Sequence, residues 1–260
     1  MLFHSLIYLL LFLPSVFTLY FLLRKFTNND GKILLIFSGI FFYGWWNVKF
    51  IPLIICSVLF NYYVSKIIVN VENKRKKKLI LFSGIFCNII YLGVFKYTDF
   101  IITNLNYLFQ SNIVTFDLPF PLAMSFFTFQ TIAYLVDCYD GEVKIKSLKD
   151  YSLFIIFFPQ LIAGPIVKFN NMIPQFNSSE NKSINTKNIL LGLTIILIGL
   201  FKKVILADNL SINVDYGFNN FESINFLESW ITSFSFTFQL YFDFSGYIDM
   251  ATGSALLFNI

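Results

Sequence analysis

Charged residues are scarce in this chain of 260 residues. They make up 13% of it, whereas hydrophobic residues make up 57%, and the mean hydropathy is +0.68. Soluble domains carry about 25% charged and about 45–50% apolar residues. The composition therefore excludes a soluble domain and predicts an integral membrane protein.

Histidine and cysteine are also scarce. The single histidine is His4, at the extreme N-terminus, which excludes a histidine-based metal cluster or a Ser-His-Asp triad within these residues unless another chain supplies the base. Cys56, Cys87 and Cys138 are odd in number, form no CxxC pair and lie within or at the end of apolar runs. We expect them to be small buried hydrophobes and not a disulfide framework.

Long apolar runs are the main feature of the chain, and a membrane-spanning helix needs about 20 mostly apolar residues. The predicted spans are Leu6–Leu23, Ile33–Trp46, Phe50–Val69, Leu79–Phe95, Leu122–Cys138, Ile189–Leu206 and Phe226–Phe258. Tyr151–Val167 is apolar too, but Pro159, Gly164 and Pro165 interrupt it. A proline is unfavourable inside a helix, so this stretch predicts a re-entrant segment surrounded by protein or a water-filled cavity.

Basic residues gather between the apolar runs and predict an orientation. Arg24, Lys25 and Lys32 follow the first run, and the five consecutive basic residues of 74–78 follow the third. Lysine and arginine favour cytoplasmic loops, so we expect the N-terminus and residues 96–121 outside. Apolar runs flank the basic run on both sides, which favours contact with lipid head groups over nucleic acid.

No repeat, long linker or soluble domain is evident, and residues 168–188 are predicted to be a surface loop. The chain is therefore interpreted as a single membrane domain over residues 1–260. Its expected fold class is all-α, a polytopic transmembrane helical bundle of about seven membrane segments, counting the re-entrant one.

Polar residues recur inside the predicted spans at helical spacing. Gln130, Tyr134 and Asp137 share one helix face, as do Ser235, Gln239 and Asp243, while Ser245 and Asp249 lie on a second face. The neutral residues are typical of hydrogen bonds between helices. A carboxylate at membrane depth needs a partner or a function. For Asp243 that partner is Lys202, Lys203 or a group outside these residues; the alternative for the lysines is to extend to the interface.

Four sequence blocks together resemble the membrane-bound O-acyltransferase family, in particular its bacterial branch of alginate O-acetylation proteins. The blocks are PLAMSFFTFQTIAYLVDCYDGE (121–142), FFPQLIAGPIVKF (157–169), GLFKKVILADNL (199–210) and FQLYFDFSGYIDMATGSALLF (238–258). The YGWW of residues 43–46 adds an early block. The resemblance implies a ring of membrane helices around a tunnel in which an acyl group, most simply acetyl, is transferred to a hydroxyl of an extracellular polysaccharide.

The resemblance also implies roles for individual residues. The family's histidine, the expected general base, would lie beyond Ile260, so no catalytic residue is assigned here. The chain is expected to be the N-terminal part of such a protein and inactive alone. Residues expected to line the tunnel or substrate site are Gln130, Tyr134, Gln160, Gly164, Pro165, Lys202, Lys203, Gln239, Tyr241, Asp243, Ser245 and Asp249.

The resemblance also implies an acyl donor and an acceptor, and several alternative functions remain open. The resemblance implies no bound cofactor or metal and an acyl donor that is acetyl-CoA or an acyl-carrier thioester. It also implies a polysaccharide acceptor, reached directly or through an extracytoplasmic acetyltransferase, in a bacterial inner membrane. Related alternatives are peptidoglycan O-acetylation, D-alanyl transfer to teichoic acid and a non-catalytic remnant. A transporter or flippase is the rival class, because broken helices and buried carboxylates also mark transport sites.

Overall fold

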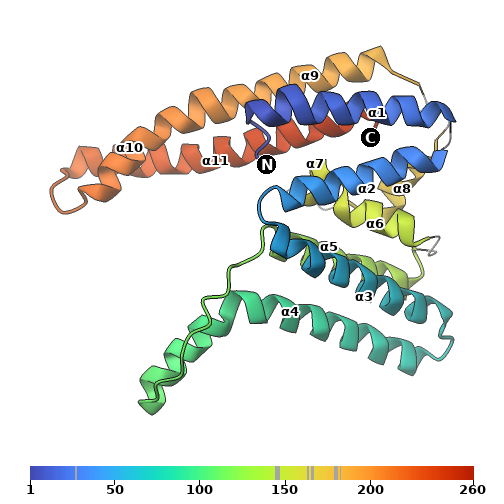
Figure 1. Ribbon diagram of the computed structural model, residues 1–260. Helices are drawn as coiled ribbons and strands as arrows, with labels where there is room; N and C mark the ends of the chain where they lie inside the picture. Colours follow the sequence, from blue (N-terminus) through green and yellow to red (C-terminus); the bar gives the residue numbers. More distant parts are fainter. Residues whose placement is uncertain (27, 144–146, 163, 165–166, 179–180, 182) are drawn as a thin grey trace. The chain divides into compact units, whose positions relative to one another are not determined.

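The structure is a computed structural model that describes residues 1–26, 28–143, 147–162, 164, 167–178, 181 and 183–260. Within these ranges every regular element is a helix, as the sequence predicts (Figure 1). The chain divides into two compact units. Most of the first unit comes from Met1–Leu34 and Gln175–Ile260, and most of the second from Leu35–Ile162.

The first unit contains two long antiparallel helical segments and an N-terminal helix. The π-helix η1 (Tyr8–Phe12) continues directly into α1 (Leu13–Phe26). A second continuous segment consists of α9 (Thr186–Leu200), the π-helix η4 (Phe201–Ala207) and α10 (Asp208–Asn219). It packs along α11 (Phe226–Leu257). Tyr8 ties η1 to α11 by donating a hydrogen bond to the Ser254 hydroxyl at 2.8 Å.

The second unit is built around α3 (Ile51–Asn70), which contacts three other helices. These are α4 (Lys74–Phe109), α5 (Met124–Asp140) and α6 (Leu148–Ile156). The short η2 (Val48–Phe50) precedes α3, and α7 (Phe158–Leu161) follows α6. Two further helices, α2 (Asn28–Gly44) and α8 (Phe169–Asn177), include residues of both units.

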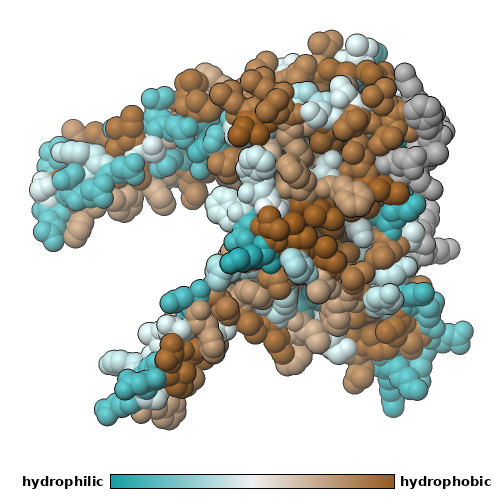
Figure 2. Space-filling model, in the orientation of Figure 1, coloured by the Kyte–Doolittle hydropathy of each residue, from teal (hydrophilic) through white to brown (hydrophobic). Residues whose placement is uncertain are grey.

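The predicted spans are helical over most of their length, although α2 ends at Gly44 and α5 begins at Met124. Among the described residues, three long helices are apolar enough to cross a membrane. They are Val48–Asn70, Lys74–Phe109 and Thr186–Asn219, and two shorter apolar helices are Tyr8–Arg24 and Gly31–Gly44. Figure 2 shows apolar residues over much of the viewed surface and a polar patch where α3 passes into α4. That region contains the basic run. The total of about seven membrane segments stays a prediction.

Two segments outside the predicted spans are helical, one of them in the predicted surface loop. Residues 96–109 continue α4, because Phe100, Ile101 and Leu105 carry the apolar pattern past Lys96 and Asp99. Residues 169–177 of the predicted 168–188 surface loop form α8. Its apolar residues recur three and four positions apart, the spacing of one helix face, and all are buried: Phe169, Met172, Ile173 and Phe176.

Candidate functional site

The helices of the first unit approach each other backbone to backbone. A methyl group added at Gly199 would lie 2.6 Å from the carbonyl oxygen of Gly246, and one added at Gly192 would lie 2.7 Å from that of Gly253. The two contacts are seven residues apart on both helices, so α9 and α11 remain close over about two turns. Small residues at such interfaces are typical of membrane helix packing.

Two lysines follow this contact and point to α11. Lys202 and Lys203 lie in η4, whose wider π-helical turn brings consecutive residues closer together around the helix axis. The Lys202 ammonium lies 2.6 Å from an Asp249 carboxylate oxygen. The Lys203 ammonium lies 2.9 Å from Asp243 and 3.0 Å from Asp208. Both lysines therefore bind carboxylates, and Lys203 is one of the two lysines that the sequence offered as a partner for Asp243.

These five residues form a cluster of ion pairs, which we call the lysine–aspartate cluster. Its members are Lys202, Lys203, Asp208, Asp243 and Asp249. The Lys203 side chain is 20% exposed, whereas those of Asp208 and Asp243 are about half exposed. Three carboxylates and two ammonium groups leave one formal negative charge on the cluster. Such a cluster can orient a polar acceptor or a second cationic group.

The other predicted residues of α11 divide between two faces. Gln239 lies on the face that packs on α9, η4 and α10, together with buried Ser235 and Gly246. Tyr241 is 61% exposed and points away from that face. The Ser245 hydroxyl is buried and has no hydrogen-bond partner among the described residues. Tyr241 and Ser245 both line a groove of about 630 Å³ on the outer surface of α11.

A second polar group lies in the second unit, where α5 packs on α6. The Gln130 amide donates a hydrogen bond of 3.1 Å to the carbonyl of Phe154. Tyr134 is buried, with its ring centroid 4.6 Å from that of Tyr151 and 5.2 Å from that of Phe169. Gln130 and Tyr134 thus share one helix face, as predicted, and their contacts are those of a packed interface. Their place in a tunnel stays a prediction.

The proline-interrupted stretch is not one straight helix. The helix α6 ends before Phe157, whose extended backbone (ψ 111°) redirects the chain, and α7 then begins with Pro159 in its first turn. Proline is tolerated there because that position needs no helical amide donor. Gln160 and Gly164 are buried. Pro165 lies outside the described residues, and the predicted return to the same membrane face stays a prediction.

Two buried cations outside the predicted site have a structural role. Arg24 is 1% exposed and donates to the carbonyls of Phe176 and Ser178 at 3.0 and 3.4 Å. Lys32 donates to the Asn177 side chain at 2.6 Å. Both cations thereby lie at the C-terminal end of α8, where the helix dipole favours positive charge. From the sequence, these two cations indicated only the orientation of the chain.

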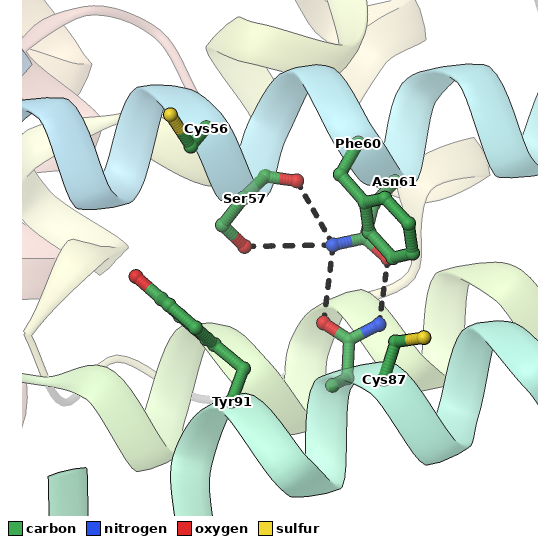
Figure 3. A pocket seen from close by; sticks show the side chains of 7 residues that line it. Cys56, Ser57, Phe60, Asn61, Cys87 and Tyr91 are labelled. Atoms are coloured by element: carbon green, nitrogen blue, oxygen red, sulfur yellow. Dashed lines mark hydrogen bonds between the residues drawn. The ribbon is translucent and has the colours of Figure 1, made fainter. Parts of the chain in front are cut away.

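A reciprocal amide pair links α3 and α4 and was not predicted from the sequence. Asn61 donates to Asn88 at 3.1 Å, and Asn88 donates back at 2.7 Å (Figure 3). Each amide uses its other hydrogen on a carbonyl one turn earlier, of Ser57 and Gly84 respectively. The sequence contains a signal for this pair, because Asn61 and Asn88 are the asparagines within the apolar stretches of two successive predicted spans.

The amide pair forms one wall of a cavity of about 220 Å³ (Figure 3). Its lining residues are Cys56, Ser57, Phe60, Asn61, Cys87, Asn88 and Tyr91. Cys56 and Cys87 are exposed, which contradicts the expectation that all three cysteines are buried; Cys138 is buried as expected. The reason is that α3 and α4 bury only part of their apolar surface and leave the rest for lipid.

The amide pair yields a stability prediction. Asn88→Leu should destabilise the chain in lipid nanodiscs by roughly 1–3 kcal/mol, because the Asn61 amide then stays buried without its partner. The double variant Asn61→Leu/Asn88→Leu should recover most of that loss, since two apolar side chains can pack where the amides met. Thermal or denaturant unfolding measures both. A double variant that is less stable than Asn88→Leu would contradict this account.

Comparison with known proteins gives the following matches. Residues 139–260 match the sequence model of MBOAT, the membrane-bound O-acyltransferase family. The whole chain is 43% identical to a peptidoglycan O-acetyltransferase of Helicobacter pylori, covering 54% of that protein. It is 33% identical, over 99% of its length, to a protein of Pseudomonas putida named "Probable alginate O-acetylase AlgI", covering 53% of it. A more distant match, a teichoic acid D-alanyltransferase of Bacillus subtilis, is 27% identical over 54% of this chain.

These matches cover only part of each relative. The chain spans about half the length of the first two relatives and corresponds to their N-terminal part. The four blocks that carried the resemblance all lie in the matched region.

Proposed function

We propose that this chain, which belongs to the membrane-bound O-acyltransferase family, is part of an enzyme that transfers an acyl group to hydroxyls of a cell-envelope glycan. The observation that carries the proposal is the match of the whole chain to a peptidoglycan O-acetyltransferase at 43% identity. Acetyl is accordingly the group we favour. The multi-pass membrane character of the chain is consistent with chemistry at the membrane.

The lysine–aspartate cluster is the part of the site that we assign to this chain. Lys202 and Lys203 lie in a π-helix within an apolar helical segment and are fixed by carboxylates from α10 and α11. Ionisable groups within membrane helices usually mark functional positions. We infer that the cluster shapes and orients the acceptor side of the site and that it does not itself take the hydroxyl proton.

The proton acceptor is proposed to come from outside these 260 residues. An acceptor hydroxyl is a weak nucleophile, and a positioned general base contributes about 10²–10⁴-fold. The single histidine is His4, and the family resemblance assigns the base to a segment beyond Ile260 and not to His4. We infer that a segment equivalent to the second half of the relatives supplies the base, and that residues 1–260 alone are inactive. The donor is an acetyl-CoA or acyl-carrier thioester.

We further propose a bacterial inner-membrane location with the N-terminus outside. Because Arg24 and Lys32 bind the end of α8, the orientation rests mainly on the basic run at the start of α4. In this orientation the basic run faces the cytoplasm, and α10 with the beginning of α11 faces the extracytoplasmic side. The acceptor, or an extracytoplasmic acetyltransferase partner, would therefore approach the protein from the side of the turn between α10 and α11.

The acyl-transfer proposal is tested in cells. Deleting the coding region of this chain should lower the ester-linked acetate that mild alkali releases from purified envelope glycans, and restoring the deleted locus should return it. Ester-linked D-alanine should not change. Unchanged acetate in the deletion strain would overturn the proposal, and a loss of D-alanine instead would favour the teichoic acid alternative.

The orientation is tested at the two ends of α4. In a variant without the three native cysteines, a cysteine at Asn112 should react with an impermeant maleimide added to intact cells. A cysteine at Lys76 should react only after the membrane is opened. Both positions are exposed in the structure, so that access depends on the side of the membrane. Labelling in the reverse pattern would show that the N-terminus is inside.

A further inference from the structure

The basic run at the start of α4 carries the net charge of the whole chain. Its five residues, 74–78, together with the neighbouring Glu72 have a formal charge of +4, which is also the formal net charge of all 260 residues. Positive and negative charges therefore balance in the rest of the chain. A concentrated charge of one sign attracts counter-charges from its surroundings, so the basic run is the part of the chain that is suited to an anionic partner.

The basic run lies at the level of the lipid head groups. The helix α3 has 20 residues and extends about 30 Å, which is the thickness of the hydrocarbon core of a bilayer. Residues 71–73, which follow α3, and the first turn of α4 therefore lie at the membrane interface. Figure 2 shows polar residues where α3 passes into α4, next to apolar residues of the two helices.

Two lysines of the basic run have different surroundings. The Lys77 ammonium donates a hydrogen bond to the carbonyl of Tyr139 in α5 and lies 5.1 Å from the centre of the Tyr139 ring. The Lys78 ammonium lies 5.8 Å from the centre of the Phe82 ring, one turn further along α4. Lys77 therefore joins α4 to α5, whereas Lys78 remains on the exposed face of α4.

That exposed face carries a second cation and a second ring. Arg75 and Lys78 are three residues apart and lie on one side of the helix, and Phe82 and Phe86 follow Lys78 at steps of four. The two phenylalanines are 58% and 64% exposed. We call these four residues the cationic–aromatic strip. Lys76 is outside the strip, because it lies about 160° around the helix from Lys78.

The strip combines the two chemistries that a phospholipid requires. The Arg75 guanidinium can bind a phosphate with two parallel hydrogen bonds, and the Lys78 ammonium adds a point charge beside it. The backbone amides of Arg75 and Lys76 already donate to the Asn73 side chain at 3.0 and 3.2 Å. Binding of an anion therefore depends on the side chains of the strip. The rings of the strip lie deeper in the membrane, where hydrocarbon is their solvent.

We propose that the cationic–aromatic strip binds an anionic phospholipid such as phosphatidylglycerol. Its phosphate lies on Arg75 and Lys78, and one acyl chain lies along Phe82 and Phe86. Zwitterionic phosphatidylethanolamine fits less well, because its own ammonium group meets the two cations. The proposal requires only a bilayer. It is independent of the acyl transfer and of the side of the membrane on which α4 begins.

Native mass spectrometry measures this binding. The protein made from the whole gene, in which any further segment that covers α4 is present, is purified in neutral detergent. It is titrated with phosphatidylglycerol or phosphatidylethanolamine of identical acyl chains, and phosphatidylglycerol should bind more tightly. Arg75→Ala and Lys78→Ala should each weaken phosphatidylglycerol binding about fivefold, the factor expected for one basic residue near an anionic head group. Neither should weaken phosphatidylethanolamine binding.

Two further variants separate the site from general effects. Lys76→Ala removes the same charge from another side of the helix, so phosphatidylglycerol affinity should fall by less than about twofold. Phe82→Ala removes contact with the acyl chain and no charge. It should weaken binding of both lipids by the same factor and leave the preference between them unchanged.

The remaining outcomes contradict the proposal. An equal loss in Lys76→Ala and Arg75→Ala would show a diffuse attraction to anionic lipid without a site. Equal affinities for the two lipids would refute the head-group assignment, and absence of lipid binding would show that the strip is not a lipid site. Binding of acetyl-CoA that displaces phosphatidylglycerol and is lost in Arg75→Ala would assign the strip to the phosphates of the acyl donor instead.

Discussion

The close contact between the α9 and α11 backbones is the constraint on which the first unit depends. Gly199 and Gly246 lie within a distance that a single added methyl group would disrupt. This proximity brings the lysines of η4 within ion-pair distance of the carboxylates of α11. At a wider helix spacing the same ionisable groups would need water or lipid head groups as partners, at considerable cost in the bilayer.

Polar groups within the membrane helices are bonded differently in the two units. In the second unit, Asn61 and Asn88 bond to each other and to backbone carbonyls one turn earlier, and Gln130 is bound to a backbone carbonyl. Such bonds hold helices together and leave little capacity for a ligand. In the first unit the cluster has an excess carboxylate and half-exposed aspartates. The capacity to interact with further groups therefore lies there, which is why we assign the acceptor side to the first unit.

Much of the fold was predictable because hydrophobic run length determines membrane helices directly. The pairing of Asp243 with a lysine was also predictable, since a membrane carboxylate needs a counterion. The buried face of α8 was missed because its polar neighbours obscured a helical pattern of only nine residues. Packing between helices determines the π-helical turn at Lys202 and places Tyr241 and Gln239 on different faces of α11. A single sequence does not encode such packing locally.

The central claim is that the lysine–aspartate cluster positions the acyl-transfer site, and a charge exchange tests it most directly. In cells that carry the whole gene, Lys203→Asp and Asp243→Lys should each abolish ester-linked acetate on the envelope glycan. The double exchange should restore a substantial part of it. Gly93→Ala serves as the expression control, because its added methyl meets no atom within 4 Å. Wild-type acetate in both single variants, with normal amounts of protein, would contradict the claim.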